Sequence, residues 1–137
     1  MLAQQSLHIT TQGRGCYAIT DQLQQQVTQA SITQGLVHVF VQHTSASLIL
    51  CENADPQVQL DLDGFLADLI VDGDPRFKHV AEGSDDMPAH IRSILTGNDL
   101  TVPIADHRLA LGVWQGVYLY EHRTAPQQRH LLLTLMQ

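Results

Sequence analysis

Histidine is the residue type that suggests chemistry most strongly in this chain. Eight histidines occur among 137 residues, one more than the seven lysines and arginines together. Imidazole binds late first-row metal ions and exchanges protons near neutral pH. Metal binding and proton transfer are therefore the first chemistries to consider.

His43 stands at the end of an apolar run rich in β-branched residues. Strand alternation places its ring on the same face as Val39 and Val41. The next residues are Thr44-Ser45-Ala46-Ser47, whose hydroxyls and main-chain amides are suited to a phosphate. The alternative is that these side chains only satisfy a turn.

His79 lies in an acidic loop, and His90 lies in the helix expected to follow it. Because His90 shares a helix face with Ile94, its ring is expected to face the body of the protein. Two imidazoles near carboxylates are the ligand types of zinc and other late first-row metals. The spacing is not diagnostic, and a solvated acidic loop with surface histidines is the alternative. The acids between the two histidines are Glu82, Asp85 and Asp86.

Glu121 is expected on a buried strand face, since alternation places it with Val117 and Leu119. A carboxylate among apolar neighbours needs a cation, a metal or a proton. Glu121 is thus a candidate to orient a metal-bound imidazole or to act as a general base. Arg129, on the following strand, is a candidate partner for Glu121 or for an anionic substrate. A purely structural ion pair is the alternative.

The other five histidines have no comparable neighbours, and we assign them no role. The single tryptophan, Trp114, is expected to pack rather than to bind a ligand. The two cysteines are far apart in the chain and are expected to be free thiols. His38 is expected in the core and His107 in an exposed turn, and the unassigned set is His8, His38, His107, His122 and His130.

The elements that must position these residues follow from hydrophobic periodicity. Segments 7–11 and 16–19, joined by Gly13-Arg14-Gly15, are expected to form an N-terminal hairpin. Apolar residues at helical spacing then predict a surface helix from about residue 20 to residue 30. The nearly continuous apolar run 36–41 favours a strand covered on both faces, and 47–51 resumes strand structure.

The second half of the chain is expected to contain two helices and three strands. A helix beginning at Asp55-Pro56 precedes the acidic stretch 72–87, which must be a long loop of a length that is more often functional than idle. A short helix over 88–95, capped by Asp86, ends at Gly97-Asn98. The apolar face of the first helix is expected to comprise Val58, Leu62, Phe65, Leu66 and Leu69, and the strands are expected near 100–104, 116–122 and 130–135.

The whole pattern indicates one α+β domain over residues 1–137, with a largely antiparallel sheet. A formal net charge of -7 offers no basic surface for a nucleic acid, so we expect no nucleic-acid partner. No apolar run approaches the roughly 20 residues that cross a bilayer, and the first residues lack the features of a secretory signal. A cytoplasmic protein without a membrane partner is expected.

Short motifs that include these candidate residues run in order along nearly the whole chain, and together they resemble the YjbQ family. Each motif alone is weak, whereas the ordered set is highly specific. The motifs are Gln42-His43-Thr44-Ser45-Ala46-Ser47-Leu48, Glu52-Asn53 with Asp55-Pro56, His79 with Glu82-Gly83, Asp85-Asp86-Met87-Pro88-Ala89-His90-Ile91, Gly97, Val102-Pro103, Leu111-Gly112, Trp114-Gln115-Gly116, Glu121 and Arg129.

This resemblance implies a subunit of two packed β-sheets and three helices that assembles as a homotrimer. It implies a divalent-metal site on His43, His79 and His90, with zinc as the expected ion and magnesium as an option for a pyrophosphate substrate. Among the matched residues we take as catalytic candidates Glu121, Arg129, Glu52 and Asp86. The candidates for binding substrate or phosphate are Thr44, Ser45, Arg129 and Gln115.

Proteins of this type are often labelled secondary thiamine-phosphate synthase, which implies joining a pyrimidine pyrophosphate to a thiazole phosphate. A metal-dependent transferase of that kind, acting on a small phosphorylated metabolite, is the first functional hypothesis. An open metal position would equally suit a hydrolase of a small phosphate ester. A trimeric metabolite-binding module without catalysis is the third hypothesis.

Overall fold

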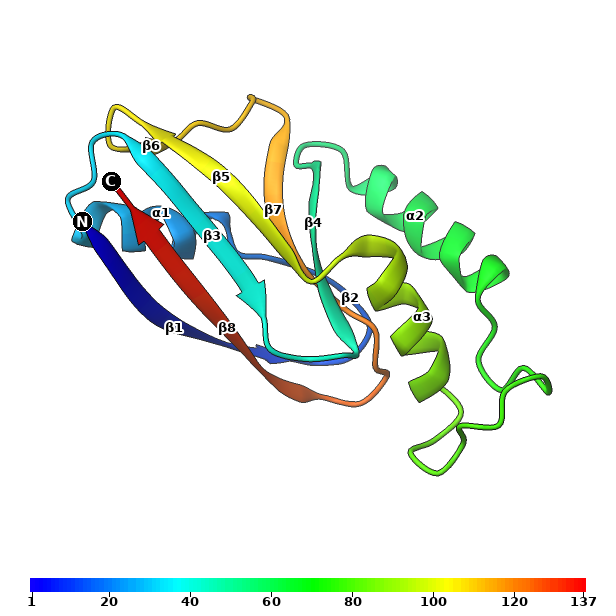
Figure 1. Ribbon diagram of the computed structural model, residues 1–137. Helices are drawn as coiled ribbons and strands as arrows, with labels where there is room; N and C mark the ends of the chain where they lie inside the picture. The colour runs from blue at the N-terminus through cyan, green and yellow to red at the C-terminus, as the bar shows by residue number, and fades with distance from the viewer.

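A computed structural model describes residues 1–137 as two antiparallel sheets and three helices. The large sheet has the strand order β1-β8-β3-β5-β6, and the small sheet has the order β2-β7-β4 (Figure 1). This arrangement confirms the predicted α+β class. The elements are β1 (Leu2–Thr11), β2 (Gly15–Ala18), α1 (Thr20–Gln29), β3 (Gly35–Val41), β4 (Ala46–Glu52), α2 (Pro56–Leu69), α3 (Asp86–Thr96), β5 (Asp99–Ala105), β6 (Arg108–Leu109), β7 (Gln115–Glu121) and β8 (Gln127–Met136).

The main core is formed by apolar residues of both sheets together with the buried face of α1. Strand alternation points every second side chain inward, and the strands β3 and β8 each contribute three fully or almost fully buried aliphatic residues. The helix α1 adds Leu23 and Val27, which lie one turn apart. The six residues from the two strands are Val37, Val39, Val41, Leu131, Leu133 and Leu135.

A second, smaller apolar cluster joins the small sheet to the helices α2 and α3. Leu66 and Ile70, at the end of α2, contact Tyr120 of β7, and Ile91 of α3 packs against the same group. Both helices lie beside β4 in Figure 1, and the long connection between them extends beyond the sheets. That connection, together with the start of α3, carries three of the candidate residues: His79, Asp86 and His90.

The expected N-terminal hairpin is wrong. The strand β1 pairs with β8 along its whole length, whereas β2 pairs with β7 in the other sheet. The glycine-rich turn between them, Gly13 to Gly15, therefore carries the chain from one sheet to the other. Pairing with β8 along ten residues gives β1 more main-chain hydrogen bonds than a short local hairpin with β2 would give.

Three predicted burial patterns also need correction. The strand β3 is buried on one face only, and Phe40 is 42% exposed on the other. On α2, Leu66 is buried but Phe65 and Leu69 are more than half exposed, and Trp114 is 61% exposed. A local apolar pattern shows that a residue suits an interior, but the topology decides which faces have a neighbour to cover them.

None of the three helices is long and apolar enough to cross a membrane. Both cysteines are free, as the sequence predicted. The short strand β6 was not predicted, since it has only two residues. It follows a turn in which Asp106 and His107 both have positive φ, which agrees with the turn expected there.

Candidate metal centre

Three side chains converge where the long loop meets α3. His79, Asp86 and His90 each offer one ligand atom, and these atoms all lie within 4.8 Å of one another. The Nε2 atoms of His79 and His90 lie 2.7 Å and 3.1 Å from the same carboxylate oxygen, Oδ2 of Asp86. The structure thus brings together two of the three histidines predicted as metal ligands and adds a carboxylate predicted as catalytic.

The local structure explains this convergence. Asp86 and His90 lie four residues apart on α3 and so share one face of the helix. His79 comes from the loop, and its ring centroid lies 5.3 Å from that of His90. Asp86 is 5% exposed, whereas His79 is exposed and His90 is half-buried. The cluster therefore has a buried carboxylate and an outer side open to solvent.

The tautomer of His90 follows from its partners. Its Nδ1 lies 2.9 Å from the main-chain oxygen of Thr44, which only accepts hydrogen bonds, so Nδ1 carries the proton. In the neutral form of this residue, the lone pair of Nε2 is directed at the anionic oxygen of Asp86. Two electron-rich atoms at this distance need a proton or a cation between them. This geometry suits a metal ligand whose other ring nitrogen is fixed by a main-chain carbonyl.

Arg123 holds the other oxygen of Asp86. Its guanidinium donates to Oδ1 of Asp86 at 2.8 Å, to Oδ2 of Asp85 at 3.0 Å and to the main-chain oxygen of Glu82 at 2.8 Å. Burial raises the pKa of Asp86, but the hydrogen bond from His79 and the nearby charges of His90 and Arg123 outweigh it, so the pKa lies below its ordinary value. Asp86 is thus a carboxylate with one oxygen occupied and the other directed at the two histidines.

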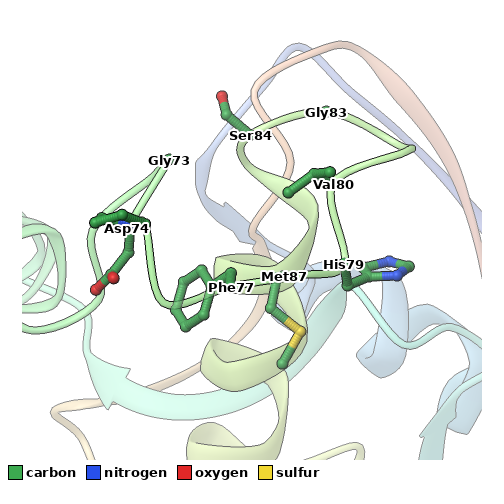
Figure 2. Close-up of a pocket in the computed structure, with 9 residues that line it drawn as sticks. Gly73, Asp74, Phe77, His79, Val80, Gly83, Ser84 and Met87 are labelled. Atoms are coloured by element: carbon green, nitrogen blue, oxygen red, sulfur yellow. The ribbon is translucent and has the colours of Figure 1, made fainter.

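A cavity of about 310 Å³ lies beneath the loop on the His79 side of the cluster. Figure 2 shows the apolar side chains of Phe77, Val80 and Met87 around it, with the ring of His79 turned away from Phe77. A second cavity, of about 280 Å³, is lined by Thr44, Ser93 and three further residues that include His90. His79 therefore lines one cavity and His90 lines the other.

His43 does not belong to this group. Its Nε2 accepts a hydrogen bond from the main-chain N–H of His130 at 2.8 Å, and the two rings stack with their centroids 5.7 Å apart. Burial, together with the charges of Arg129 and His130, lowers the pKa of His43. The lone pair that would bind a metal is engaged in this hydrogen bond. Its predicted role as a ligand therefore gains no support from this arrangement.

Glu121 and Arg129 form a fully buried ion pair. The guanidinium of Arg129 donates Nε–H to Oε1 of Glu121 at 2.8 Å, and it also donates to Oε2. The Thr11 hydroxyl and the main-chain N–H groups of His122 and Arg123 donate to the same carboxylate. At 0% and 4% exposure and with this set of internal partners, the carboxylate and the guanidinium fit the structural alternative.

The remaining candidates have local structural partners. Ser45 is buried, and its hydroxyl accepts from Arg129 at 2.9 Å. Glu52 accepts from the main-chain N–H groups of Ala54 and Asp55 ahead of α2, and Gln115 accepts from the N–H of Gly112. These contacts satisfy turns, whereas the exposed Thr44 lies beside His90 and lines the second cavity.

Two residues near the site were missed from the sequence. Arg123 carries no motif that would distinguish it from any exposed arginine. His122 is fully buried, and its Nε2 lies 2.8 Å from the Ser47 hydroxyl, whereas its Nδ1 has no partner. Burial, followed by the charges of Arg92 and Arg14, lowers the pKa of His122 to about 3. The strand pattern around residue 122 was the one signal that could have indicated its burial.

The structure corrects the prediction for His38 and the reason given for the orientation of His90. His38 is not a core residue: its side chain is 32% exposed and its Nε2 lies 2.8 Å from Oδ2 of Asp99. Ile94, which shares a helix face with His90, is 79% exposed. The ring of His90 nonetheless faces the body of the protein, as expected, with its nitrogens on the carbonyl of Thr44 and on Asp86.

The family model for UPF0047 protein YjbQ-like matches residues 5–137. The chain belongs to this family. It is 48% identical over 130 residues to a UPF0047 protein of Synechocystis, covering 95% of this chain and 88% of that protein. It is 38% identical over 136 residues to the UPF0047 protein YjbQ of Escherichia coli, covering 98% of each chain. These matches confirm the resemblance noted from the motifs.

Solved structures of other proteins share the fold. A conserved hypothetical protein from Thermus thermophilus superposes with a TM-score of 0.87 at 36% identity, covering 96% of this chain and 99% of that chain. A YjbQ/UPF0047 family protein from Clostridium acetobutylicum gives a TM-score of 0.85 at 29% identity, covering 98% and 99%. The family is one of unknown function, so these likenesses establish the fold and leave the reaction to be inferred from the site.

Proposed function

We propose that the protein is a metal-dependent enzyme that acts on a small phosphorylated metabolite. The ion, zinc by preference, would be held by His79, Asp86 and His90, so that Asp86 takes the place expected for His43. The observation that supports this most directly is the convergence of two imidazole nitrogens and one carboxylate oxygen within 4.8 Å. The fixed Nδ1–H of His90, which directs Nε2 at that oxygen, supports it further.

The donor set fits a late first-row ion better than magnesium. Two nitrogens and one oxygen are typical of catalytic zinc sites, which keep one position open for substrate or water. Magnesium favours oxygen ligands, and His79 and His90 offer none. When bound, a divalent ion would supply positive charge to phosphate oxygens and so stabilise a leaving phosphate or pyrophosphate.

The chain's own residues would position both the ligands and the substrate. Arg123 holds Asp86 so that one oxygen faces the histidines, and the carbonyl of Thr44 fixes the ring of His90. The apolar side chains of Phe77, Val80 and Met87 in the cavity beside His79 would contact the organic part of a substrate. The hydroxyl of Thr44, beside His90, would donate to a phosphate oxygen.

Among phosphorylated metabolites, we propose the thiamine-phosphate synthase reaction as the activity to test first. That reaction joins two phosphorylated compounds, a pyrimidine pyrophosphate and a thiazole phosphate. Two cavities of similar size, about 310 Å³ and 280 Å³, flank the cluster, one beside His79 and one beside His90. An arrangement with a separate cavity on each side suits the joining of two molecules.

The test is to measure thiamine phosphate formation and bound metal on the same samples. Wild-type protein loaded with Zn²⁺ should form product, and the variants His79→Ala and His90→Ala should lose about 100-fold or more of the activity and most of the metal. Because His79 is exposed and His90 is half-buried, both variants should keep their far-UV circular dichroism. His107→Asn, in an exposed turn, is the matched histidine control. Folded His79 and His90 variants with full metal content and activity would refute the proposal.

Hydrolysis of a small phosphate ester is the second candidate, since the open outer side of the cluster would admit water to the same ion. A panel of phosphate esters, assayed with and without a chelator, separates it from the transferase. Chelator-sensitive release of phosphate without thiamine phosphate formation would favour the hydrolase. Tight metabolite binding without turnover in either assay would favour a binding module.

A further inference from the structure

Two exposed histidines face each other across neighbouring strands of the large sheet. His8 of β1 and His130 of β8 are direct partners in the antiparallel register. Both side chains lie on the outer face of the sheet, opposite the apolar core, because Ile9 and Leu131 beside them point inward. Neither belongs to the His79–Asp86–His90 cluster.

The main chain of His130 shows which kind of cross-strand pair this is. Its N–H donates to Nε2 of His43, and its carbonyl accepts from the N–H of Gln42. Both groups therefore point towards the chain that follows β3 and away from β1. In an antiparallel ladder, a residue whose main chain points away from its neighbour forms a non-hydrogen-bonded pair with it, with Cα atoms about 4.5 Å apart and closer side chains.

The rings are arranged as this pairing predicts. The centroids of His8 and His130 lie 4.6 Å apart, with the ring planes at 88°. On the other side of His130, the ring of His43 stacks at 5.7 Å and is itself fixed by its hydrogen bond to the His130 N–H. The imidazole of His130 is thus held between two others, and the nitrogens of His8 and His130 have no protein hydrogen-bond partner.

We propose that His8 and His130 form a second metal site, which chelates a late first-row divalent cation such as Cu²⁺ or Zn²⁺. Two imidazoles in direct contact, without a carboxylate, select such ions over magnesium or calcium. The remaining positions on the ion would be filled by water, since both residues are exposed. His43 keeps its Nε2 bonded to the main chain and stacks against the site.

Such a site would stabilise the edge of the large sheet. The strand β1 is an edge strand, and its partner on the inner side is β8. An ion bound to both histidines binds the paired strands and not the separated ones, so it stabilises the folded state by mass action. The site links metal availability to the attachment of the N-terminal strand and is independent of the proposed reaction.

The test uses Cu²⁺ and the full chain carrying His90→Ala, which removes a ligand of the first cluster. This background should bind one Cu²⁺ with two coordinated nitrogens in its electron paramagnetic resonance spectrum. Adding His8→Gln or His130→Gln should weaken binding by about 100-fold, because a two-point chelate becomes a single contact. Cu²⁺ should also slow hydrogen exchange in β1 of the His90→Ala protein and not in the two double variants.

His38→Gln in the same background is the matched control, since His38 lies on the same outer face but is bonded to Asp99. It should leave the Cu²⁺ affinity unchanged. All three added substitutions are at partly or fully exposed positions, and melting curves without metal verify folding. Unchanged Cu²⁺ affinity in both the His8 and the His130 variants would overturn the proposal, as would a spectrum showing a single coordinated nitrogen. Neither result bears on the activity assigned to His79, Asp86 and His90.

Discussion

At the residue scale, the partners of each histidine distinguish its role better than its neighbours in sequence do. His79 and His90 share one carboxylate oxygen, His43 accepts a main-chain hydrogen bond, and His122 is buried beside Ser47. Residue types and the family motifs identified His79, His90 and Asp86. Residue types and motifs could not show that His43 differs from these residues. The difference lies in the hydrogen bond that occupies Nε2 of His43, which only the structure reveals.

The lowered pKa of the buried His122 leads us to expect that the stability of the protein depends on pH. Its pKa is about 3 in the folded protein, mainly because of burial, against an ordinary value of about 6.5. Below pH 6.5 the unfolded chain binds a proton at this residue that the folded chain does not bind until about pH 3. This residue therefore costs stability as the pH falls through that window, by up to roughly 1.4 kcal/mol per pH unit.

The measurement is urea unfolding at several pH values for wild type and His122→Gln. The variant should lose less stability than wild type between pH 6.5 and pH 4, because one proton uptake by the unfolded state is removed. His107→Asn, which alters an exposed histidine in a turn where asparagine tolerates the positive φ, should follow wild type. Parallel curves for wild type and His122→Gln would contradict the assignment.

At the element scale, the long loop and α3 form the candidate site, and the sheets hold them in place. Two helix limits were predictable from strong local signals, since α2 starts at Pro56 after Asp55 and Gly97 is the C-cap of α3. The predicted cap of α3 was wrong, because Asp85 is the N-cap and Asp86 is the first residue of the helix. The pairing of β1 with β8 was not predictable, because it joins residues more than 100 positions apart. Local patterns favour the nearest partner, whereas in the folded chain all ten residues of β1 pair with β8.

Substitution by alanine should have opposite effects on stability at two glycines, Gly35 at the start of β3 and Gly64 on α2. A Cβ at Gly35 would collide with the main-chain oxygen of Met136, so Gly35→Ala should destabilise the protein by about 2 kcal/mol. Gly64 lies on α2 with open space around it, and Gly64→Ala should stabilise by about 0.5–1 kcal/mol because alanine favours a helix. Denaturant unfolding of both variants measures these opposite signs. A Gly35→Ala protein as stable as wild type would show that β3 and the C-terminal end do not approach so closely.

At the scale of the whole molecule, the fold was predictable as a class and the surface was not. The sequence predicted three helices and α+β architecture, and the family motifs predicted two sheets, which the structure has. Exposed Phe40, Phe65 and Trp114 were predicted to be buried. One chain offers no element to cover them, so the error lies in the assumption that every apolar face meets another part of the same chain.

The homotrimer implied by the family resemblance stays a prediction, and the exposed apolar residues give it a physical reason. Light scattering coupled to size-exclusion chromatography should give a mass about three times the 15.2 kDa of the chain. Burying such residues between subunits would contribute about 25 cal/mol per Å² of apolar surface. A mass of one chain at micromolar concentration would exclude a stable trimer.

The first and last residues of the chain are hydrogen-bonded to each other, with the N–H of Gln137 donating to the oxygen of Met1 at 3.0 Å. Both ends leave the fold at a single corner, and in Figure 1 this corner lies far from the loop that precedes α3. A short peptide could therefore bridge the ends without bending either strand. Such a cyclised backbone could be reopened at the turn of Asp106 and His107, giving a circular permutant in which the group of His79, Asp86 and His90 is unaltered.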